Sequence, residues 1–431
     1  MKYAFYTLGC KVNQYETQAM QQLLLARGDT LGEFDGVCDC YIVNTCTVTA
    51  VSDKKSRNAI RRARKLNPNA VIGVCGCYAQ TAPEEIRKLD VDVLIGTDGR
   101  AEFLDKLAAA AAEKLRWEHV EDAGLPRAFE QLPSGGLAER TRALLKVEDG
   151  CNNFCTYCII PYARGRVRSL PLENAVAEAR KLAAEGYREI VVNGIEISSR
   201  GWEWHDGSCL RQLLAALCAA VPSVRIRLGS LEPRTIDEEF CKTLSGFENL
   251  CPQFHLSLQS GSDSVLRRMH RKYDSARYLQ SVELLHRYFP GCAVTTDLIV
   301  GFPGETEAEF EASLALIRRC ALSKVHIFPY SRREGTPAAK MPDQVPKAVK
   351  EARASRAAAV AAELEDAFHT SLIGTEQPVL FEQPENGFYA GHAPNYAKVY
   401  TAPGELHNAV RRVRITELCR DGVFGVLTDT P

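Results

Sequence analysis

The first hundred residues alternate short apolar runs with longer segments of mixed polarity. The apolar runs have the length and composition of buried strands and cover residues 2–8, 40–45, 70–75 and 91–96. Two of the segments between them, 13–28 and 52–67, repeat apolar positions at helical spacing. This alternation predicts an open parallel α/β sheet domain with helices on both faces.

The same alternation returns after residue 140 and continues for six units. The expected strands are 143–148, 189–194, 224–230, 254–259, 293–302 and 324–330. Eight such units would close a barrel, whereas six predict a partial (β/α)6 barrel whose open mouth admits a large substrate. Between the two α/β regions, a helical stretch at 101–115 is followed by a segment with several Pro and Gly residues, which indicates a connection.

The end of the chain has a different pattern. A long exposed helix is expected at 346–374, and short β-rich runs separated by Gly and Pro follow it. Those runs predict a small all-β barrel. The fold class is therefore α/β with an all-β addition, and the expected divisions are 1–110, a linker at 111–140, 141–370 and 371–431.

The composition says little about the fold, but it limits the kinds of chemistry and the partners that the protein can have. The 431 residues carry a net charge of −1, so any contact with nucleic acid has to come from local basic patches. We see neither a signal peptide nor an apolar run of about 18 residues, which favours a cytoplasmic protein. Sixteen cysteines in such a chain indicate metal or redox use rather than disulfides.

Three of these cysteines stand close together in CNNFCTYC, with the spacing C-x3-C-x2-C. Soft thiolates such as those of Cys151, Cys155 and Cys158 select iron–sulfur clusters, zinc or copper. A structural zinc site closes with a fourth ligand, and the candidates are Cys209, His255 and His270. A cubane 4Fe–4S cluster instead uses three thiolates and leaves one iron open, as catalytic metal sites do. The tight spacing argues against three unrelated loop cysteines.

Another set of cysteines follows the predicted strands of the N-terminal region. Cys10 follows the first strand, Cys46 the second, and either Cys75 or Cys77 the third. We choose Cys77, because Cys75 still belongs to the strand pattern. Ligand sites in open α/β sheets gather at the carboxyl ends of strands, so these three thiols are predicted to converge. Ordinary buried cysteines are the alternative.

CNNFCTYC after the first barrel strand resembles the radical S-adenosylmethionine superfamily. The resemblance implies that S-adenosylmethionine chelates the open iron and is cleaved to a 5′-deoxyadenosyl radical, with Tyr157 beside the adenine. Later segments resemble the family's other cofactor contacts. The residues that this implies are Asn193 and Glu196 near the methionine amino group, Arg227 and Ser230 near a carboxylate or ribose, Gln259, and Gly301 near the adenine.

GCKVNQYET, NTCTV, GCYAQ and CNNFCTYCIIPYARGRVRS are similar to the signatures of the methylthiotransferases, and the match covers nearly the whole chain. The resemblance implies a second 4Fe–4S cluster on Cys10, Cys46 and Cys77, whose open iron carries the sulfur to be methylated and inserted. It also implies a C-terminal TRAM domain that binds RNA. Arg200 departs from the pattern, since an aromatic residue is expected there.

The branches of this family modify isopentenyladenosine in tRNA, N6-threonylcarbamoyladenosine in tRNA, or an aspartate of a ribosomal protein. TLGCKVNQYET most resembles the bacterial threonylcarbamoyladenosine branch. The predicted reaction is therefore methylthiolation of carbon 2 of that nucleoside at tRNA position 37, with two 4Fe–4S clusters and S-adenosylmethionine. An iron–sulfur electron carrier and a zinc-stabilised RNA-binding module are the alternatives from other functional classes.

The expected partners are the anticodon stem-loop of tRNA and an electron donor protein, with no membrane and no stable protein partner. Phosphate contacts need Lys and Arg, and stacking on splayed bases needs aromatic rings. The candidate basic positions are 54–65, 267–272, 411–414, and Arg164, Arg166 and Arg168 at the mouth of the site. The candidate stacking rings are Tyr389, Tyr396 and Tyr400. A solvated helix face is the simpler interpretation of 54–65.

Overall fold

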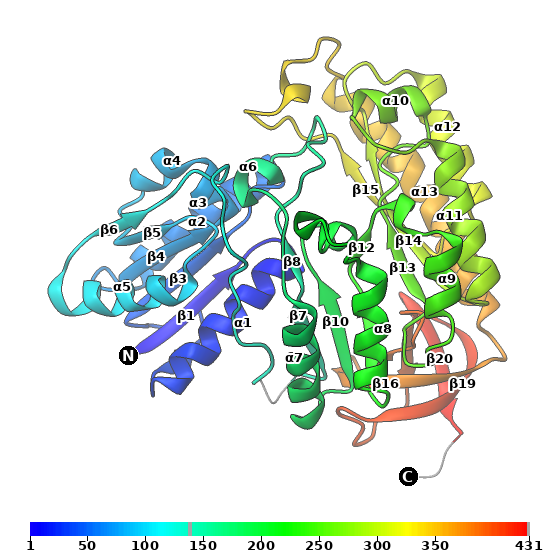
Figure 1. Cartoon of the computed structure of the whole chain (residues 1–431), viewed down its shortest axis with the longest axis horizontal. Helices are drawn as coiled ribbons and strands as arrows, with labels where there is room; N and C mark the ends of the chain where they lie inside the picture. Colours follow the sequence, from blue (N-terminus) through cyan, green and yellow to red (C-terminus); the bar gives the residue numbers. More distant parts are fainter. Residues whose placement is uncertain (137–139, 429–431) are drawn as a thin grey trace.

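The computed structural model describes residues 1–136 and 140–428. Its N-terminal part is an open sheet of six parallel strands in the order β2-β1-β3-β4-β5-β6, blue to cyan in Figure 1. The strands are β1 (Lys2–Thr7), β2 (Thr30–Gly32), β3 (Cys40–Thr45), β4 (Val71–Gly76), β5 (Val93–Ile95) and β6 (Trp117–His119). The predicted parallel sheet is confirmed, and two short edge strands, β2 and β6, are added to it.

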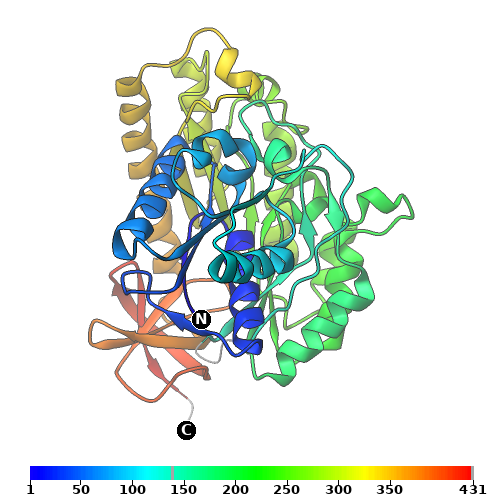
Figure 2. The ribbon, with the colours of Figure 1, turned by 90° about the vertical axis from the view of Figure 1, so that its left-hand side faces the viewer.

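Helices cover both faces of this sheet, because successive strand residues point to opposite sides. On one face, α1 (Lys11–Ala26) and α5 (Arg100–Glu113) pack on residues such as Ile42 and Val93. On the other, α2 (Ala50–Leu66), α3 (Cys77–Thr81) and α4 (Pro83–Arg87) pack on residues such as Tyr41 and Ile72. Figure 2 views the molecule from the side of this domain.

The central part is an open barrel, green to yellow in Figure 1. Its parallel strands form two sheets, β11-β10-β7 and β12-β13-β14-β15, which a parallel bridge between Ile226 and Leu250 joins. The strands are β7 (Arg142–Lys146), β10 (Glu189–Asn193), β11 (Arg225–Leu228), β12 (Ser230–Leu231), β13 (Gln253–Leu256), β14 (Ala293–Val300) and β15 (Lys324–Pro329). The six predicted units are therefore present, and β7 and β15 form the open edges.

The outer helices of the barrel bury the apolar side of these strands in one large core. They are α7 (Leu172–Ala184), α8 (Leu210–Ala220), α9 (Glu238–Leu244), α11 (Ser275–Tyr288) and α12 (Glu307–Arg319). The long helix α13 (Lys347–Ser371) also packs on the barrel, against β15. We expected it to be exposed, but Ala357 and Val360 belong to the barrel core.

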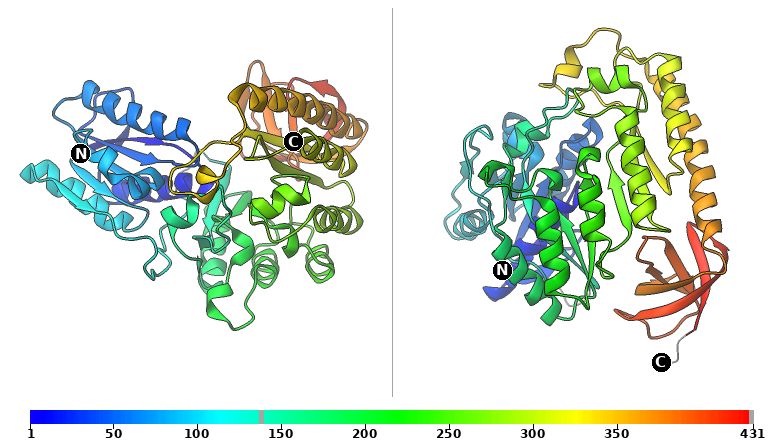
Figure 3. Two further views of the ribbon diagram at one scale, coloured as in Figure 1. Left: turned by 90° about the horizontal axis from the view of Figure 1, so that it is seen from above. Right: turned by 45° about the vertical axis from the view of Figure 1, so that its right-hand side comes forward.

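Five strands at the end of the chain form a closed barrel in the order β16-β17-β18-β20-β19, orange to red in Figure 3. They are β16 (Glu376–Glu385), β17 (Phe388–His392), β18 (Lys398–Thr401), β19 (Val410–Cys419) and β20 (Gly422–Leu427). Arginines from the central barrel attach it: Arg225 donates to the carbonyl of His392, and Arg142 pairs with Glu382 at 2.7 Å. No helix in the described part of the chain is long and apolar enough to cross a membrane.

Candidate metal centres

The strand order of the N-terminal sheet places its cysteines at the natural ligand site of the fold. The order 2-1-3-4-5 has its topological switch point between β1 and β3, where loops diverge and leave a crevice. Cys10 ends the loop after β1 and caps α1, Cys46 follows β3, and Cys77 begins α3 directly after β4. Cys75 points the other way, into the core beside α5.

The backbone before Cys10 brings the first two thiols together. Gly9 has a φ of +104°, a conformation that residues with a Cβ rarely adopt. A Cβ at this position would lie 2.9 Å from Sγ of Cys46. Asn13 then fixes both loops, since its side-chain amide donates to the carbonyls of Leu8 (2.7 Å) and Thr45 (2.9 Å). The N-terminal trio, Cys10, Cys46 and Cys77, is thus built by tertiary contacts.

Burial favours the neutral form of two of these thiols, those of Cys46 and Cys77. Burial raises the pKa of Cys77 to about 12, with Cys10 and Cys46 adding to the effect and Arg164 opposing it. The pKa of Cys46 is also raised by burial. A metal that binds such thiols must displace their protons.

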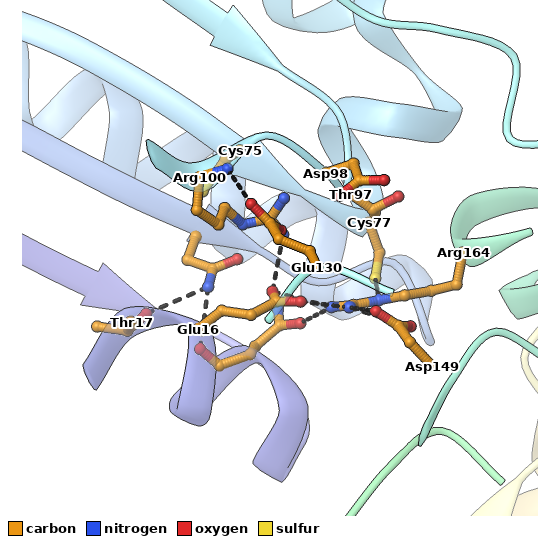
Figure 4. Close-up of polar contacts among 12 residues, drawn as sticks. Glu16, Thr17, Cys75, Cys77, Thr97, Asp98, Arg100, Glu130, Asp149 and Arg164 are labelled. Carbon is orange, nitrogen blue, oxygen red and sulfur yellow. Dashed lines mark hydrogen bonds and ion pairs between the residues drawn. The ribbon is translucent and has the colours of Figure 1, made fainter. Parts of the chain in front are cut away.

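Arg164 connects this trio to the barrel. It ends α6 (Ile160–Arg164), six residues after Cys158, and its side chain is fully buried. Its Nε lies 3.4 Å from Sγ of Cys77, and its terminal nitrogens bond to Asn13 (2.6 Å) and Glu16 (2.5 Å) of α1. Figure 4 shows the guanidinium between Cys77, Glu16 and Asp149.

The charges around Arg164 form a buried network between the two domains. Glu16 also pairs with Arg100 at 2.7 Å, and Asp149 pairs with Lys146 (2.8 Å) and Arg168 (3.1 Å). Burial acts to raise the pKa of Glu16, but Arg100, Arg164 and Lys146 outweigh it and hold the value low, at about 2. We expected Arg164 and Arg168 at the mouth of the site; this was wrong, because both are buried, Arg164 paired with Glu16 and Asp149 and Arg168 with Asp149.

The second trio, Cys151, Cys155 and Cys158, lies on one loop, and hydrogen bonds to residues 268 and 269 of the barrel domain hold this loop in place. Thr156 donates its backbone amide to Met269 (3.1 Å) and its hydroxyl to Arg268 (2.8 Å). Arg271 then reaches Sγ of Cys155 at 3.2 Å while its Nε donates to the hydroxyl of Tyr273. We expected the segment 267–272 to be a basic surface for RNA, but Arg268 is paired with Glu309 and Arg271 is used at this trio.

The two trios face one another. Helix α3, which begins with Cys77, packs on α6, which follows Cys158. Burial raises the pKa of Cys158 to about 12, and Cys77 is close enough to contribute to that shift. Sites that are far apart in sequence therefore share one interdomain space.

The arrangement of the six cysteines of the two trios fits iron–sulfur clusters rather than a site for a single metal ion. Among the described residues, no three Cys, His, Asp or Glu side chains surround a single metal position. A 4Fe–4S cluster binds its thiolates through separate irons, and so does not require such crowding. Asn193 ends β10, which pairs with β7, the strand that leads toward the second trio; among the described residues, both polar atoms of its buried amide lack a partner, as does one oxygen of Glu148. Such orphaned groups need a ligand or water.

The other predicted cofactor positions are distributed around this space. Glu196 is half-buried, contributes to the pKa shift of Cys151, and accepts a hydrogen bond from the backbone amide of Ser198. Tyr157 packs against a small core that contains Met269 and Phe302. Gln259 has a φ of +65° and donates its amide to the carbonyl of Asp297.

Three positions have surroundings that the sequence did not indicate. Arg227 pairs with Glu189 at 2.6 Å and donates to the carbonyl of Pro394, so it joins the barrel to the C-terminal domain. At Gly301, with φ +72°, a Cβ would collide with the Lys350 side chain of α13. Arg200 is buried over the Trp204 ring and donates to the carbonyl of Leu170.

A cavity of about 480 Å³ lies where the three domains meet. Ser230, His255 and Asp297 line it from the barrel, Tyr396 from the C-terminal domain, and Lys11, the residue after Cys10, from the N-terminal domain. Most of its other lining residues are also polar. Of the tyrosines expected to stack on bases, Tyr389 and Tyr400 are buried, which corrects that prediction, whereas Tyr396 is exposed.

Sequence reasoning missed the roles of Arg164, Glu16, Arg271 and Lys11. All four stand in or near segments that the motifs already marked, since Lys11 and Glu16 lie in GCKVNQYET and Arg164 in CIIPYARGR. The signal that could have found Glu16 is an acidic residue on the otherwise buried face of α1.

Comparisons with known proteins agree with this architecture. Residues 145–317 match the radical SAM superfamily, and residues 2–96 match the Uncharacterized protein family UPF0004. The chain is 42% identical to the threonylcarbamoyladenosine tRNA methylthiotransferase MtaB of Bacillus subtilis, over 92% of this chain and 89% of that protein. It is 38% identical to the protein of that name from Thermotoga maritima, over 98% and 96%.

Two further comparisons define the limits of this likeness. The tRNA-2-methylthio-N(6)-dimethylallyladenosine synthase of Maricaulis maris is 34% identical over 98% of this chain and 96% of that protein. Among solved structures, the radical S-adenosylmethionine methyltransferase TsrM from Kitasatospora setae superposes with a TM-score of 0.57 at 16% identity, covering 78% of this chain and 76% of that one. That second likeness concerns the fold alone.

Proposed function

Because the chain belongs to the radical S-adenosylmethionine methylthiotransferases that act on tRNA, we propose that it methylthiolates carbon 2 of N6-threonylcarbamoyladenosine at position 37. When bound, S-adenosylmethionine and the 4Fe–4S clusters supply the radical, the methyl group and the sulfur.

The convergence of two three-thiol sites supports methylthiolation in particular. Cys151, Cys155 and Cys158 would hold one cluster with an open iron, and Asn193, whose amide is unpartnered, and Glu196, which acts on Cys151 electrostatically, would be polar partners for S-adenosylmethionine. Cys10, Cys46 and Cys77 would hold the second. An aromatic C–H bond offers no acidic proton, so a general base alone does not open it. Two reactive centres that share one space therefore suit the replacement of hydrogen by a methylthio group.

The polar side chains of the interdomain cavity support threonylcarbamoyladenosine, rather than isopentenyladenosine, as the proposed substrate. An isopentenyl group is an apolar chain that gains from burial against apolar walls. A threonylcarbamoyl group carries a carboxylate, a hydroxyl and an amide, which lose free energy when buried without polar partners. Polar and charged side chains, among them those of His255 and Asp297, line the cavity beside Lys11 together with apolar surface, so the second group would find there the polar partners that it needs.

The C-terminal barrel is proposed to bind the anticodon stem-loop, together with the exposed face of α2. That face carries Lys54, Lys55 and Arg61, all exposed. Lys and Arg of this kind supply affinity through phosphates without reading sequence. An electron donor protein is the further partner that radical generation requires.

Nucleoside mass spectrometry of tRNA from cells that lack the gene tests the proposal. The expected result is the loss of 2-methylthio-N6-threonylcarbamoyladenosine, with the unmethylthiolated nucleoside accumulating in its place. Loss of the isopentenyl analogue would assign the chain to the other tRNA branch. A product found only on a ribosomal protein would contradict the proposal.

A further inference from the structure

Among the described residues that line the interdomain cavity, Lys11 is the one lysine or arginine without an acidic partner. On the basis of the function proposed above, we propose that Lys11 binds the carboxylate of the threonyl group and so selects the substrate by its charge. Three features of the described residues support this: the pairing of every other permanent cation in the cavity, the place of Lys11 beside Cys10, and the field at the start of α1.

The other Lys and Arg side chains that line the cavity already have acidic partners. Arg227 pairs with Glu189 at 2.6 Å, Lys324 with Glu365 at 2.9 Å, and Lys398 with Glu385 at 2.9 Å. Within residues 1–136 and 140–428, Lys11 has neither an ion pair nor a side-chain hydrogen bond, and its side chain stays exposed to the cavity. An anion that enters would therefore find an uncompensated positive charge at Lys11, whereas the carboxylate of Asp297 on the opposite wall has only the His255 imidazole beside it, at 3.4 Å.

The position of Lys11 suits a group attached to the reacting adenine. It follows Cys10 directly and opens α1, so a carboxylate held by its ammonium group lies within a few residues of the N-terminal trio. The opposite wall consists of barrel residues such as Ser230, His255 and Asp297. The substituent would thus fill the cavity while the ring faces the space between the two trios.

The start of α1 adds to the attraction for an anion. The helix has sixteen residues, its first turn contains no acidic side chain, and Cys10 provides no side-chain cap. Free amide groups at a helix N-terminus carry partial positive charge.

The direct test is binding of anticodon stem-loops to Lys11→Met and Lys11→Arg. The RNAs would carry threonylcarbamoyladenosine, isopentenyladenosine or unmodified adenosine at position 37, and the holoenzymes would be kept anaerobic. For the threonylcarbamoyl RNA, K11M should lose roughly 10- to 100-fold in affinity, or about 1.4–2.8 kcal/mol at 1.4 kcal/mol per tenfold change. K11R should keep most of the affinity, and the other two RNAs should bind K11M as they bind the native enzyme.

Steady-state kinetics with the same variants provide a second measurement. Because the role is positioning by charge, KM for the threonylcarbamoyl RNA should rise in K11M by a larger factor than kcat falls. Lys88→Met, an exposed lysine of the same domain, is the matched control. Iron and sulfide content and the EPR spectrum of each variant show whether the neighbouring Cys10 site stays loaded.

Two outcomes would overturn the inference. Equal loss of affinity for all three RNAs in K11M would mean that Lys11 contacts phosphate, and an unchanged affinity would mean that it contacts nothing. Failure of the proposed function looks different, because the native enzyme itself would then form no product from the threonylcarbamoyl RNA.

Discussion

The two cysteine trios reach the same chemistry by opposite routes. One occupies a single loop, where eight residues supply all three thiols and Thr156 ties the loop to the barrel. The other is collected from three strand ends between residues 10 and 77, and exists only when the sheet is folded. A site whose ligands are close in sequence depends only on its own loop. A site whose ligands follow different strands depends on the folding of the whole domain.

In each trio, one cysteine accepts a hydrogen bond from an arginine, and the two arginines differ in the same way as the trios. Within the barrel, Arg271 donates hydrogen bonds to Sγ of Cys155 and to the hydroxyl of Tyr273. Arg164 serves Cys77 across the domain boundary and is part of a buried network with Glu16 and Asp149. We expect disturbance at Arg271 to stay local, and disturbance at Arg164 to affect both the site and the docking of the domains.

The largest effect is expected from removing either trio. Changing Cys151, Cys155 and Cys158 to Ala should abolish reductive cleavage of S-adenosylmethionine, because no thiolates hold the cluster that binds it. Changing Cys10, Cys46 and Cys77 to Ala should leave that cleavage but abolish methylthio product. Chromatography of 5′-deoxyadenosine and nucleoside mass spectrometry measure the two outcomes. Cleavage that persists in the first variant would contradict the assignment of the trios.

The next largest effect is expected from Arg164→Met. It leaves Glu16 and Asp149 buried without one of their cations, and breaking a buried ion pair costs about 3–5 kcal/mol. Chemical denaturation should therefore show a loss of that size in the free energy of unfolding. Arg166→Met, two residues away and exposed, is the control and should unfold like the native chain. Equal stability of the two variants would show that the network does not hold the domains together.

Acid should weaken the same network. The pKa of Glu16 in the folded protein is about 2, below its ordinary value near 4.5. A carboxylate whose pKa falls on folding contributes stability above its unfolded pKa, and that stability is lost as the pH falls through the folded value. Melting temperatures should therefore decline between about pH 4.5 and pH 2. The Glu16→Gln variant should be less stable at pH 7 and should show a flatter decline, and a parallel decline would contradict this account.

The smallest effect is expected from Arg271→Gln. A hydrogen bond from a charged group contributes about 1.5–3 kcal/mol, here to the thiolate form of Cys155. Loss of a positive charge beside a cluster should make its reduction potential more negative. The variant lacking Cys10, Cys46 and Cys77 contains only the loop cluster and allows its EPR-monitored potential to be measured alone. An unchanged reduction potential of the loop cluster in this background would contradict the role given to Arg271.

The same contrast explains how much could be predicted from sequence. Buried strands and amphipathic helices are local patterns, so the N-terminal sheet, the six barrel units and the C-terminal strands were all predictable. The loop trio was predictable for the same reason. Strands β2 and β6 are three residues each, too short to produce a pattern.

Buried charge was not predictable, because it depends on partners far away in the chain. Arg164 looked like an RNA contact, and its partner Glu16 stands 148 residues earlier. Arg227 looked like a cofactor contact, and its carboxylate is Glu189 on the neighbouring strand. A lone basic residue in a sequence shows a charge but not which atoms neutralise it.

The bond between Arg164 and Cys77 also imposes an order on biosynthesis. The ribosome finishes the N-terminal sheet, with all three of its thiols, well before residue 164 is made. During that interval Glu16 has Arg100 but lacks the second guanidinium, and the face that carries Cys77 is uncovered. The N-terminal trio is synthesised first, but Arg164, which bonds to its Cys77, is synthesised only after the loop trio. Iron loading of the N-terminal trio should therefore follow domain docking. Nascent chains that end before residue 160 should retain less iron at the N-terminal trio than chains that extend past the barrel.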